Sequence, residues 1–284
     1  MTKLFQRLLI FSIGIPLIIV LVAYLPFYNH LAVNMVVIVI SALGAVEFSQ
    51  ILAKKNYVLP PGEAAILGSL APAAMTLSIS LNIPGELVPA AFIFGSSWLI
   101  ASRVFSPLED ISQVLDRISI GLSIMIYPGM FLLWIIRMAI LAHATIIILS
   151  FLLMIFANDS LAWAIGILFG KGNRGVVPAS PNKSIAGFIG GMLGSLLIGI
   201  IAPLLFPTAF TTNHTFPQPI AGIILGTCVG IVAIIGDLAE STIKRSGQVK
   251  DSGFIIPGRG GVLDSVDSIA LAAPVFYALY WILF

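Results

Sequence analysis

Nine long apolar runs, separated by short polar segments, occupy most of the chain. They lie near 8–25, 31–52, 64–82, 87–105, 118–136, 139–157, 185–206, 219–236 and 268–284, with 169 as an alternative end for the sixth. Each is close to the roughly 20 residues that a helix needs to cross a bilayer. The apolar positions are continuous instead of alternating with polar ones, which favours helices over barrel strands. The pattern predicts an all-α polytopic membrane protein with about nine transmembrane helices.

The basic residues test this assignment of spans. If the N-terminus is cytoplasmic, 13 of the 14 Lys and Arg residues fall in cytoplasmic segments, and Arg137 falls on the opposite side. Positive residues favour the cytoplasmic side of a membrane, so we expect the N-terminus inside and the C-terminus on the opposite side. The first run resembles a signal peptide, but no clear cleavage site follows it, and we interpret it as a retained span.

Composition agrees with lipid as the main solvent. The chain is 59% hydrophobic and 9% charged, whereas soluble globular chains carry about 25% charged residues. The net charge of +2 is too small to indicate a nucleic-acid partner. No soluble domain is expected. The predicted division is 1–136 for the N-terminal spans and 137–284 for the catalytic spans, with cytoplasmic loops at 170–184 and 237–267.

Two features of the apolar runs have structural interpretations. Gly187, Gly191, Ser195 and Gly199 repeat at four-residue spacing, a stripe of small residues that lets helices approach closely in lipid. Cys228 is the single cysteine and lies in an apolar run. It is interpreted as a small core residue and not as a nucleophile.

The acidic residues are the first candidates for chemistry. Six of the 12 fall at or near the predicted cytoplasmic ends of the sixth, eighth and ninth spans: Asp159, Asp237, Glu240, Asp251, Asp264 and Asp267. Ionisable groups at membrane depth are costly and therefore indicate function. The others are interpreted as solvated interface residues: Glu47, Glu63, Glu86, Glu109, Asp110 and Asp116.

The spacing of these acids suggests a cation site. Asp237 and Glu240 are three residues apart, as are Asp264 and Asp267, so each pair shares a helix face. Converging carboxylates repel one another unless a cation lies between them, and oxygen ligands without His or Cys suit Mg²⁺. Helix capping is the structural alternative, but it needs one acid and not two pairs. The prediction is a magnesium site formed by Asp237, Glu240, Asp264 and Asp267.

Basic residues and glycines accompany the acids in the last predicted loops. The basic residues are Lys183, Lys244, Arg245, Lys250 and Arg259. Acids that hold Mg²⁺ next to a basic cluster would suit a polyphosphate, because phosphoryl-type transfer depends mainly on charge neutralisation and positioning. Positive-inside topology and binding of anionic lipid head groups are the alternatives. The run 170–175 matches G-x-G-x-x-G, but no strand precedes it, so a dinucleotide site is rejected.

Four motifs resemble one enzyme family. Residues 241–267 resemble the C-terminal signature of phosphatidate cytidylyltransferases, also called CDP-diacylglycerol synthases. Gly236-Asp237-Leu-Ala-Glu240-Ser241 resembles the family's G-D-x-x-E-S segment, and Ser180-Pro-Asn-Lys183-Ser184 resembles its S-P-x-K-[ST] motif. Asn158-Asp159 and Phe169-Gly170-Lys171 resemble its upstream elements. The resemblance covers roughly 155–268, and the nine-span count also agrees with it.

The resemblance implies a magnesium-dependent reaction of phospholipid biosynthesis, in which CTP and phosphatidate give CDP-diacylglycerol and pyrophosphate. It implies catalytic roles for Asp237, Asp264, Asp267 and Lys250, with Glu240 as a further metal ligand. It implies substrate binding by Ser180, Lys183, Ser241, Lys244, Arg245, Arg259 and Asp159. A second, monovalent cation and a homodimer are additional candidates. The implied location is the inner (cytoplasmic) membrane, with membrane lipids as surroundings and no nucleic acid as partner.

The sequence departs from the family pattern at three positions. Arg259 replaces the usual His, Ser265 replaces the usual Arg between the two aspartates, and Asn182 replaces a common basic residue. Arg259 keeps a positive charge and a donor but is no base near pH 7. A catalytically inactive relative, a lipid nucleotidyltransferase with another lipid substrate and a secondary transporter therefore stay as alternatives. The acids gather at one end of the spans, whereas a transporter site lies near the midplane.

Overall fold

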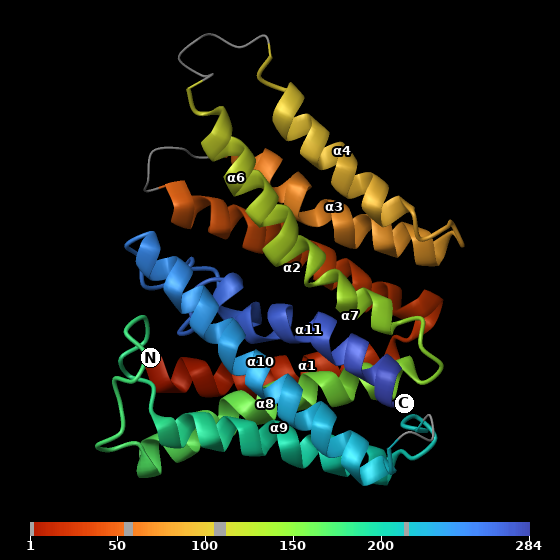
Figure 1. The fold of residues 1–284 in the computed structure, drawn as a ribbon, viewed down its shortest axis with the longest axis vertical. Coiled ribbons are helices and arrows are strands. Elements are labelled where there is room, and N and C mark those ends of the chain that lie inside the picture. The colour runs from red at the N-terminus through yellow and green to blue at the C-terminus, as the bar shows by residue number, and fades with distance from the viewer. Residues whose placement is uncertain (1–2, 54–58, 105–111, 213–215) are drawn as a thin grey trace. The chain divides into compact units, whose positions relative to one another are not determined.

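The structure is a computed structural model, which describes residues 3–53, 59–104, 112–212 and 216–284. Within these ranges the regular secondary structure is helical (Figure 1), apart from two isolated antiparallel bridges, Arg174 with Ser184 and Ile256 with Gly260. The predicted all-α class is confirmed.

Among the described residues, seven helical stretches are long and apolar enough to cross a membrane: Phe27–Leu52, Pro61–Ser80, Val114–Met138, Ala144–Phe169, Ile185–Leu205, Gln218–Ser246 and Leu263–Leu283. The first and fourth predicted runs lie on shorter apolar helices, Ser12–Tyr24 and Leu87–Ala101. All nine predicted runs therefore lie on helices, and the chain is a multi-pass membrane protein. Its orientation in the membrane stays a prediction.

The chain forms two compact units, Met1–Ile140 with Ile243–Val266, and Leu141–Thr242 with Asp267–Phe284. The helices of the first unit are α1 (Lys3–Tyr24), α2 (Phe27–Ala53), α3 (Pro61–Ser80), α4 (Leu87–Ala101), α6 (Val114–Ile124), the π-helix η1 (Met125–Met130) and α7 (Leu133–Met138). Those of the second are α8 (Ala144–Phe169), α9 (Ile185–Leu205) and most of α10 (Gln218–Ser246) and α11 (Leu263–Leu283). Segment 243–266, which comprises the end of α10, the loop after it and the start of α11, thus belongs with the N-terminal helices.

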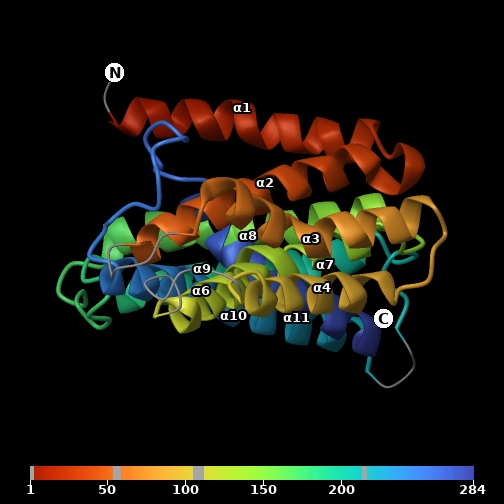
Figure 2. The same cartoon turned by 90° about the horizontal axis from the view of Figure 1, so that it is seen from above.

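In the first unit, α2 packs along α3, as Figure 2 also shows. Ser41 on α2 donates hydrogen bonds to the carbonyls of Gly68, at 2.8 Å, and of Pro128. Pro128 lies inside η1, where Phe131 N donates to Ile126 O at 3.1 Å. Proline removes one backbone donor from a helix, and the wider five-residue repeat accommodates that loss. The fifth span is therefore interrupted in a way that hydropathy did not predict.

In the second unit, the small residues of α9 allow close contact with its neighbours, as the four-residue stripe predicted. A Cβ on Gly199 would lie 2.5 Å from the carbonyl oxygen of Gly222 on α10, and one on Gly191 would lie 2.8 Å from Asn158 Oδ1 on α8. Asn158 is buried and donates to Ser195 Oγ at 3.0 Å and to Gly230 O at 3.2 Å. Its amide therefore links α8 to both neighbours.

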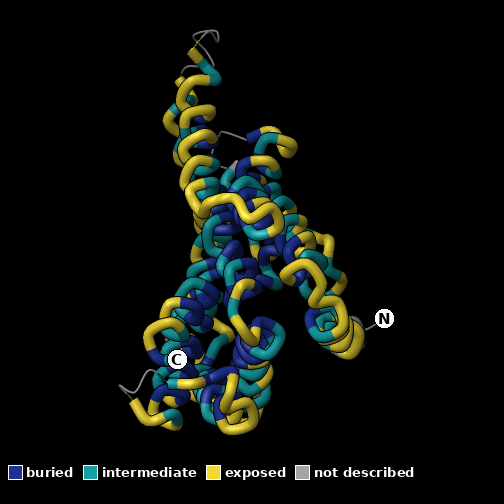
Figure 3. Tube along the Cα trace, turned by 90° about the vertical axis from the view of Figure 1, so that its right-hand side faces the viewer, coloured by how far each residue is buried: buried dark blue, intermediate teal, exposed yellow. Residues whose placement is uncertain are grey.

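The helix ends differ from the predicted spans where the candidate chemistry lies. α10 continues to Ser246 and α11 begins at Leu263, so the predicted loop 237–267 shrinks to 247–262. Hydropathy marks only the apolar part of a helix, and charged residues such as Lys244 and Asp264 extend these two helices beyond it. Exposed residues recur beside buried ones along the helices (Figure 3), and many are large and apolar, as expected for faces that meet lipid.

Candidate active site

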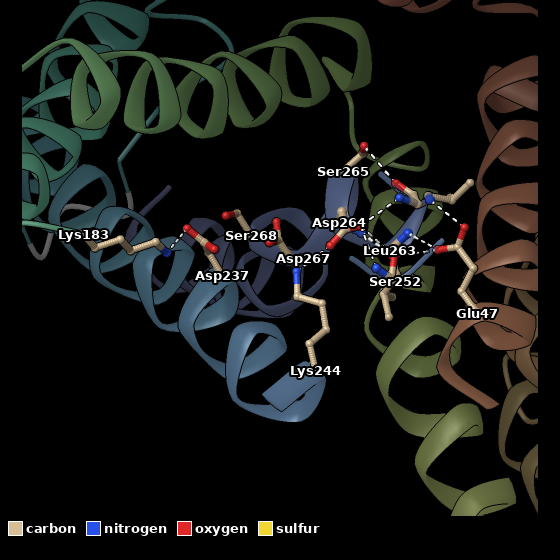
Figure 4. Close-up of polar contacts among 12 residues, drawn as sticks. Glu47, Lys183, Asp237, Lys244, Ser252, Leu263, Asp264, Ser265, Asp267 and Ser268 are labelled. Carbon is tan, nitrogen blue, oxygen red and sulfur yellow. Dashed lines mark hydrogen bonds and ion pairs between the residues drawn. The ribbon is translucent and has the colours of Figure 1, made fainter. Parts of the chain in front are cut away.

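Asp264, in the first turn of α11, organises the segment that precedes it (Figure 4). Its Oδ2 accepts hydrogen bonds from the backbone N–H groups of Ser252, at 2.8 Å, and Gly261, at 2.7 Å, and from Ser252 Oγ at 3.0 Å. Its Oδ1 accepts from Lys244 Nζ at 2.5 Å, and the Asp264 side chain is only 7% exposed. Both carboxylate oxygens are thus engaged within the first unit.

Two glycines are required by this arrangement. Gly260 has a φ of +114°, a conformation that side-chain-bearing residues rarely adopt, and a Cβ there would overlap Asp264 Oδ2. A Cβ on Gly261 would overlap Ser252 Oγ. The Gly-Arg-Gly-Gly run at 258–261 therefore turns the chain tightly enough for its N–H groups to reach the acid.

Glu47 corrects the sequence interpretation, which took it for a solvated interface residue. It is 3% exposed, and its oxygens accept from Val262 N at 2.9 Å, Leu263 N at 2.8 Å and Ser252 Oγ at 2.9 Å. Figure 4 shows the carboxylate facing this segment from α2. Its position within the apolar run 31–52 was the signal that could have revealed it, because ionisable groups inside spans are functional candidates.

Glu63 was also taken for a solvated residue, and this too was wrong. It forms an ion pair with Arg117, whose side chain is 3% exposed, and accepts from Trp98 Nε1 at 2.7 Å. These contacts tie α3 to α6 and α4. Because a buried guanidinium must be paired, we interpret Glu63 as a structural residue of the first unit.

In the second unit, Lys183 forms an ion pair with Asp237 of α10. The two side chains are 25% and 34% exposed, so the pair is accessible from outside. Ser184 caps α9 by accepting from Gly187 N at 3.1 Å. The cap fixes the start of α9 directly after Lys183, which explains the adjacency of lysine and serine in this motif.

Asp267 lies near three further acids of the same unit, and we call the four residues Asp159, Asp237, Glu240 and Asp267 the acid cluster. Asp267 is buried, accepts from its own neighbour Ser268 N at 2.6 Å, and lies within electrostatic range of Asp237, Glu240 and Asp159. Gly236 permits this approach, because a Cβ there would lie 2.7 Å from Asp267 O. The glycine of the G-D-x-x-E-S segment therefore lets α10 and α11 meet beside the acids.

The acids suit magnesium by chemistry, since the cluster offers carboxylate oxygens and neither His nor Cys. Across the ranges that the structure describes, however, no group of three or more His, Cys, Asp or Glu residues is placed to hold a metal ion. Lys183 and Lys244 occupy oxygens of Asp237 and Asp264. The magnesium site of Asp237, Glu240, Asp264 and Asp267 stays a prediction.

The remaining predicted substrate-binding residues differ in accessibility. Arg245 and Lys250 are exposed, whereas Ser180, Ser241, Arg259 and Asp159 are half-buried. Arg259 lies between two glycines of left-handed φ, +74° and +114°. The two exposed cations are accessible to an anionic ligand from outside the molecule.

The loop that matches the dinucleotide motif follows a helix, as the sequence interpretation assumed. Residues 170–175 follow α8, a helix, where a dinucleotide site requires a strand. Gly172 and Gly175 have φ values of +95° and +81°, so these glycines serve the turns of a loop.

Comparison with known proteins identifies the family. The profile described as "Cytidylyltransferase family" matches residues 5–283. A phosphatidate cytidylyltransferase of Synechocystis is 53% identical over 58 residues, or 20% of each chain. That of Haemophilus influenzae is 37% identical over 143 residues, 49% of this chain and 47% of the relative, so these alignments span half or less of the relatives' lengths. That of Chlamydia pneumoniae is 28% identical over 284 residues, 96% and 91%.

The helices and their charged ends define a multi-pass membrane protein with acidic and basic clusters. The chain belongs to the Cytidylyltransferase family, which the match over nearly its whole length shows.

Proposed function

We propose that this protein transfers a cytidylyl group from CTP to phosphatidate, forming CDP-diacylglycerol and pyrophosphate at the cytoplasmic membrane. The observation that carries the proposal is the ion pair of Lys183 with Asp237 on α10, directly after Gly236, whose backbone lies against that of the buried Asp267, in a chain that the family matches over 5–283. The relatives named phosphatidate cytidylyltransferase support the choice of substrates.

The basic residues would bind the phosphates of both substrates. Lys183 and Lys244 are already paired with aspartates, and either lysine can exchange its carboxylate for a phosphate oxygen, which forms an equally strong charge-assisted bond. Arg245 and Lys250 are exposed and would attract the anionic ligands first. We assign the CTP phosphates to Lys183, because it is the lysine that contacts the acid cluster.

The reaction needs little covalent help from the protein. A phosphatidate oxygen would attack the α-phosphorus of CTP, forming one P–O bond, while the bond from that phosphorus to the β-phosphate oxygen breaks. Pyrophosphate leaves with the electron pair of the broken bond. Because the attacking phosphate is already an anion, no strong base is required, and Arg259 in place of His is compatible with the reaction.

A divalent cation would be held by Asp237, Glu240 and Asp267, with Asp264 as a further candidate. When bound, it would offset the charge of the nucleotide phosphates and of the leaving group. The protein's own contribution is to carry Asp237 and Glu240 on α10 and Asp267 on α11, and to pair Lys183 with Asp237.

The direct test is turnover of radiolabelled CTP by purified protein with phosphatidate and Mg²⁺, with and without a chelator. We expect labelled CDP-diacylglycerol, its loss with the chelator, and its return on adding excess Mg²⁺. Parallel reactions with dCTP, ATP and other phospholipids distinguish related lipid nucleotidyltransferases. Transfer to another lipid alone would replace phosphatidate in the proposal, and no transfer to any lipid would overturn it.

A further inference from the structure

We propose that Glu47 is a positioning residue, which holds segment 247–262 and the first turn of α11 so that Asp264 meets Lys244. The expected effect of Glu47 on CTP turnover rests on the proposed function, whereas its expected effect on the order of the segment does not. Glu47 lies more than 200 positions before its partners, with separations of 205 to 216 residues. It is the point at which α2 reaches the segment that carries the family signature.

One face of α2 follows the segment. Gly44, Glu47 and Ile51 are three and four residues apart, so they share a helix face. A Cβ on Gly44 would lie 3.5 Å from Leu263 Cδ1, and a Cβ on Gly247 would lie 2.5 Å from Ile51 O. Glu47 binds between these points, at Ser252, Val262 and Leu263. The face therefore contacts both ends of the segment.

A carboxylate is required at this position. Oε1 accepts from Val262 N and Oε2 from Leu263 N, so each oxygen serves one backbone donor. Ser252 Oγ lies 2.9 Å from Glu47 and 3.0 Å from Asp264, and its single proton can serve one acid at a time. Consecutive N–H groups at 261, 262 and 263 thus go to Asp264, Glu47 and Glu47. The two acids together define the backbone where α11 begins.

Two glycines beside Glu47 leave room for its carboxylate because they have no side chain. A Cβ on Gly253 would lie 2.5 Å from Glu47 Oε1, and one on Gly261 would overlap Glu47 Oε2. Both glycines lie within the predicted family signature, which therefore depends on a residue of the N-terminal half.

The experiment compares Glu47→Gln and Glu47→Asp with the control Glu63→Gln in the full-length protein. Gln keeps one acceptor oxygen and turns an amide N–H₂ toward a backbone donor, so it loses one of the two backbone bonds. Asp keeps both oxygens but is one methylene shorter. Glu63 is an acid of the same unit that contacts Arg117 and Trp98, so its substitution removes an acid contact without touching the segment.

The first readout is hydrogen exchange of the backbone amides at 252 and 261–263, followed by mass spectrometry. For Glu47→Gln we expect exchange there to rise at least about tenfold, because a hydrogen bond to a charged group is lost. Glu47→Asp should give a smaller rise, and Glu63→Gln should leave these amides unchanged. The proposal would be overturned if hydrogen exchange in the segment were unchanged in Glu47→Gln. It would also be overturned if Glu63→Gln raised exchange there by the same amount.

The second readout is steady-state CTP turnover. We expect Glu47→Gln to lower kcat about tenfold or more with a smaller change in the KM for CTP, and Glu47→Asp to recover part of the loss. Loss of kcat in step with loss of folded protein would assign Glu47 a purely structural role and contradict the proposal. If the wild-type protein transfers no cytidylyl group, the function proposal fails while the exchange data still decide whether Glu47 orders the segment.

Discussion

The two units hold their acidic residues in different ways. In the first unit, Glu47 and Asp264 are bound by backbone N–H groups at 252 and 261–263, and Lys244 pairs with Asp264. In the second, Asp267 lies near Asp237, Glu240 and Asp159, and Lys183 pairs with Asp237. The carboxylates of the first set accept mainly from these backbone N–H groups, whereas Asp267 of the second accepts its backbone bond from its own neighbour, Ser268, and lies near other acids.

If the proposed function holds, this difference separates a framework from a binding site. Carboxylates bound to fixed N–H groups keep their charge and position without any ligand. Carboxylates that face one another repel, and they are stabilised by a cation that enters between them. We therefore expect changes in the first set to alter both folding and turnover, and changes in the second to alter turnover and ligand binding.

Asp237→Asn should have the largest effect on turnover. The substitution removes a charge from the acid cluster and the partner of Lys183, and we expect kcat for CTP to fall by about 10²–10³ or more. Helical content and thermal unfolding in detergent should stay close to wild type. Asp116→Asn, at an exposed position, is the matched control and should retain activity. Near-normal turnover of Asp237→Asn would remove Asp237 from the site.

Asp264→Asn should show a mixed effect, with turnover lower by about 10- to 100-fold and stability lower by about 1–3 kcal/mol. An amide cannot accept from Lys244 and both backbone donors as a carboxylate does, and it removes the negative charge that faces a mostly buried ammonium. Denaturant unfolding in detergent, with turnover measured on the same preparation, checks both numbers. A variant that loses turnover but keeps wild-type stability would move Asp264 from the framework to the binding site.

Lys183→Met should act mainly on nucleotide binding. We expect the KM for CTP to rise about tenfold, because one charge-assisted contact to phosphate is lost. Lys183→Arg should retain part of the affinity, since it keeps the charge. Lys171→Met, at an exposed position in the same loop, is the control. An unchanged KM in Lys183→Met would argue against the assignment of CTP to this side of the acid cluster.

Arg259→His should have the smallest effect. His restores the usual family residue, and the glycines on either side with φ of +74° and +114° keep the same turn. We expect kcat within about threefold of wild type, because neither side chain is needed as a strong base. A pH profile of turnover checks this. A complete loss of activity would show that the guanidinium of Arg259 has a role of its own.

The sequence predicted the positions of the helices better than the contacts between them. The nine apolar runs all lie on helices, since continuous hydropathy reports directly on spans. Asp237 and Glu240 both lie within α10, so their three-residue spacing is helical as predicted, and their role as a pair stays a prediction. Glu47 and Glu63 were misread, because one sequence does not show what a distant helix or loop will place against a lone acid.

What the sequence determined by itself is the set of local properties: the apolar spans, the close-packing stripe of α9, the spacing of acids along α10 and α11, and the motifs of the Cytidylyltransferase family. The tertiary structure decided which acids accept hydrogen bonds from the backbone of distant segments and which lie near other acids. It joined Glu47 to Val262 and Leu263, and Lys183 to Asp237. Local spacing follows from the geometry of one helix, whereas contacts between distant segments depend on how all the helices pack.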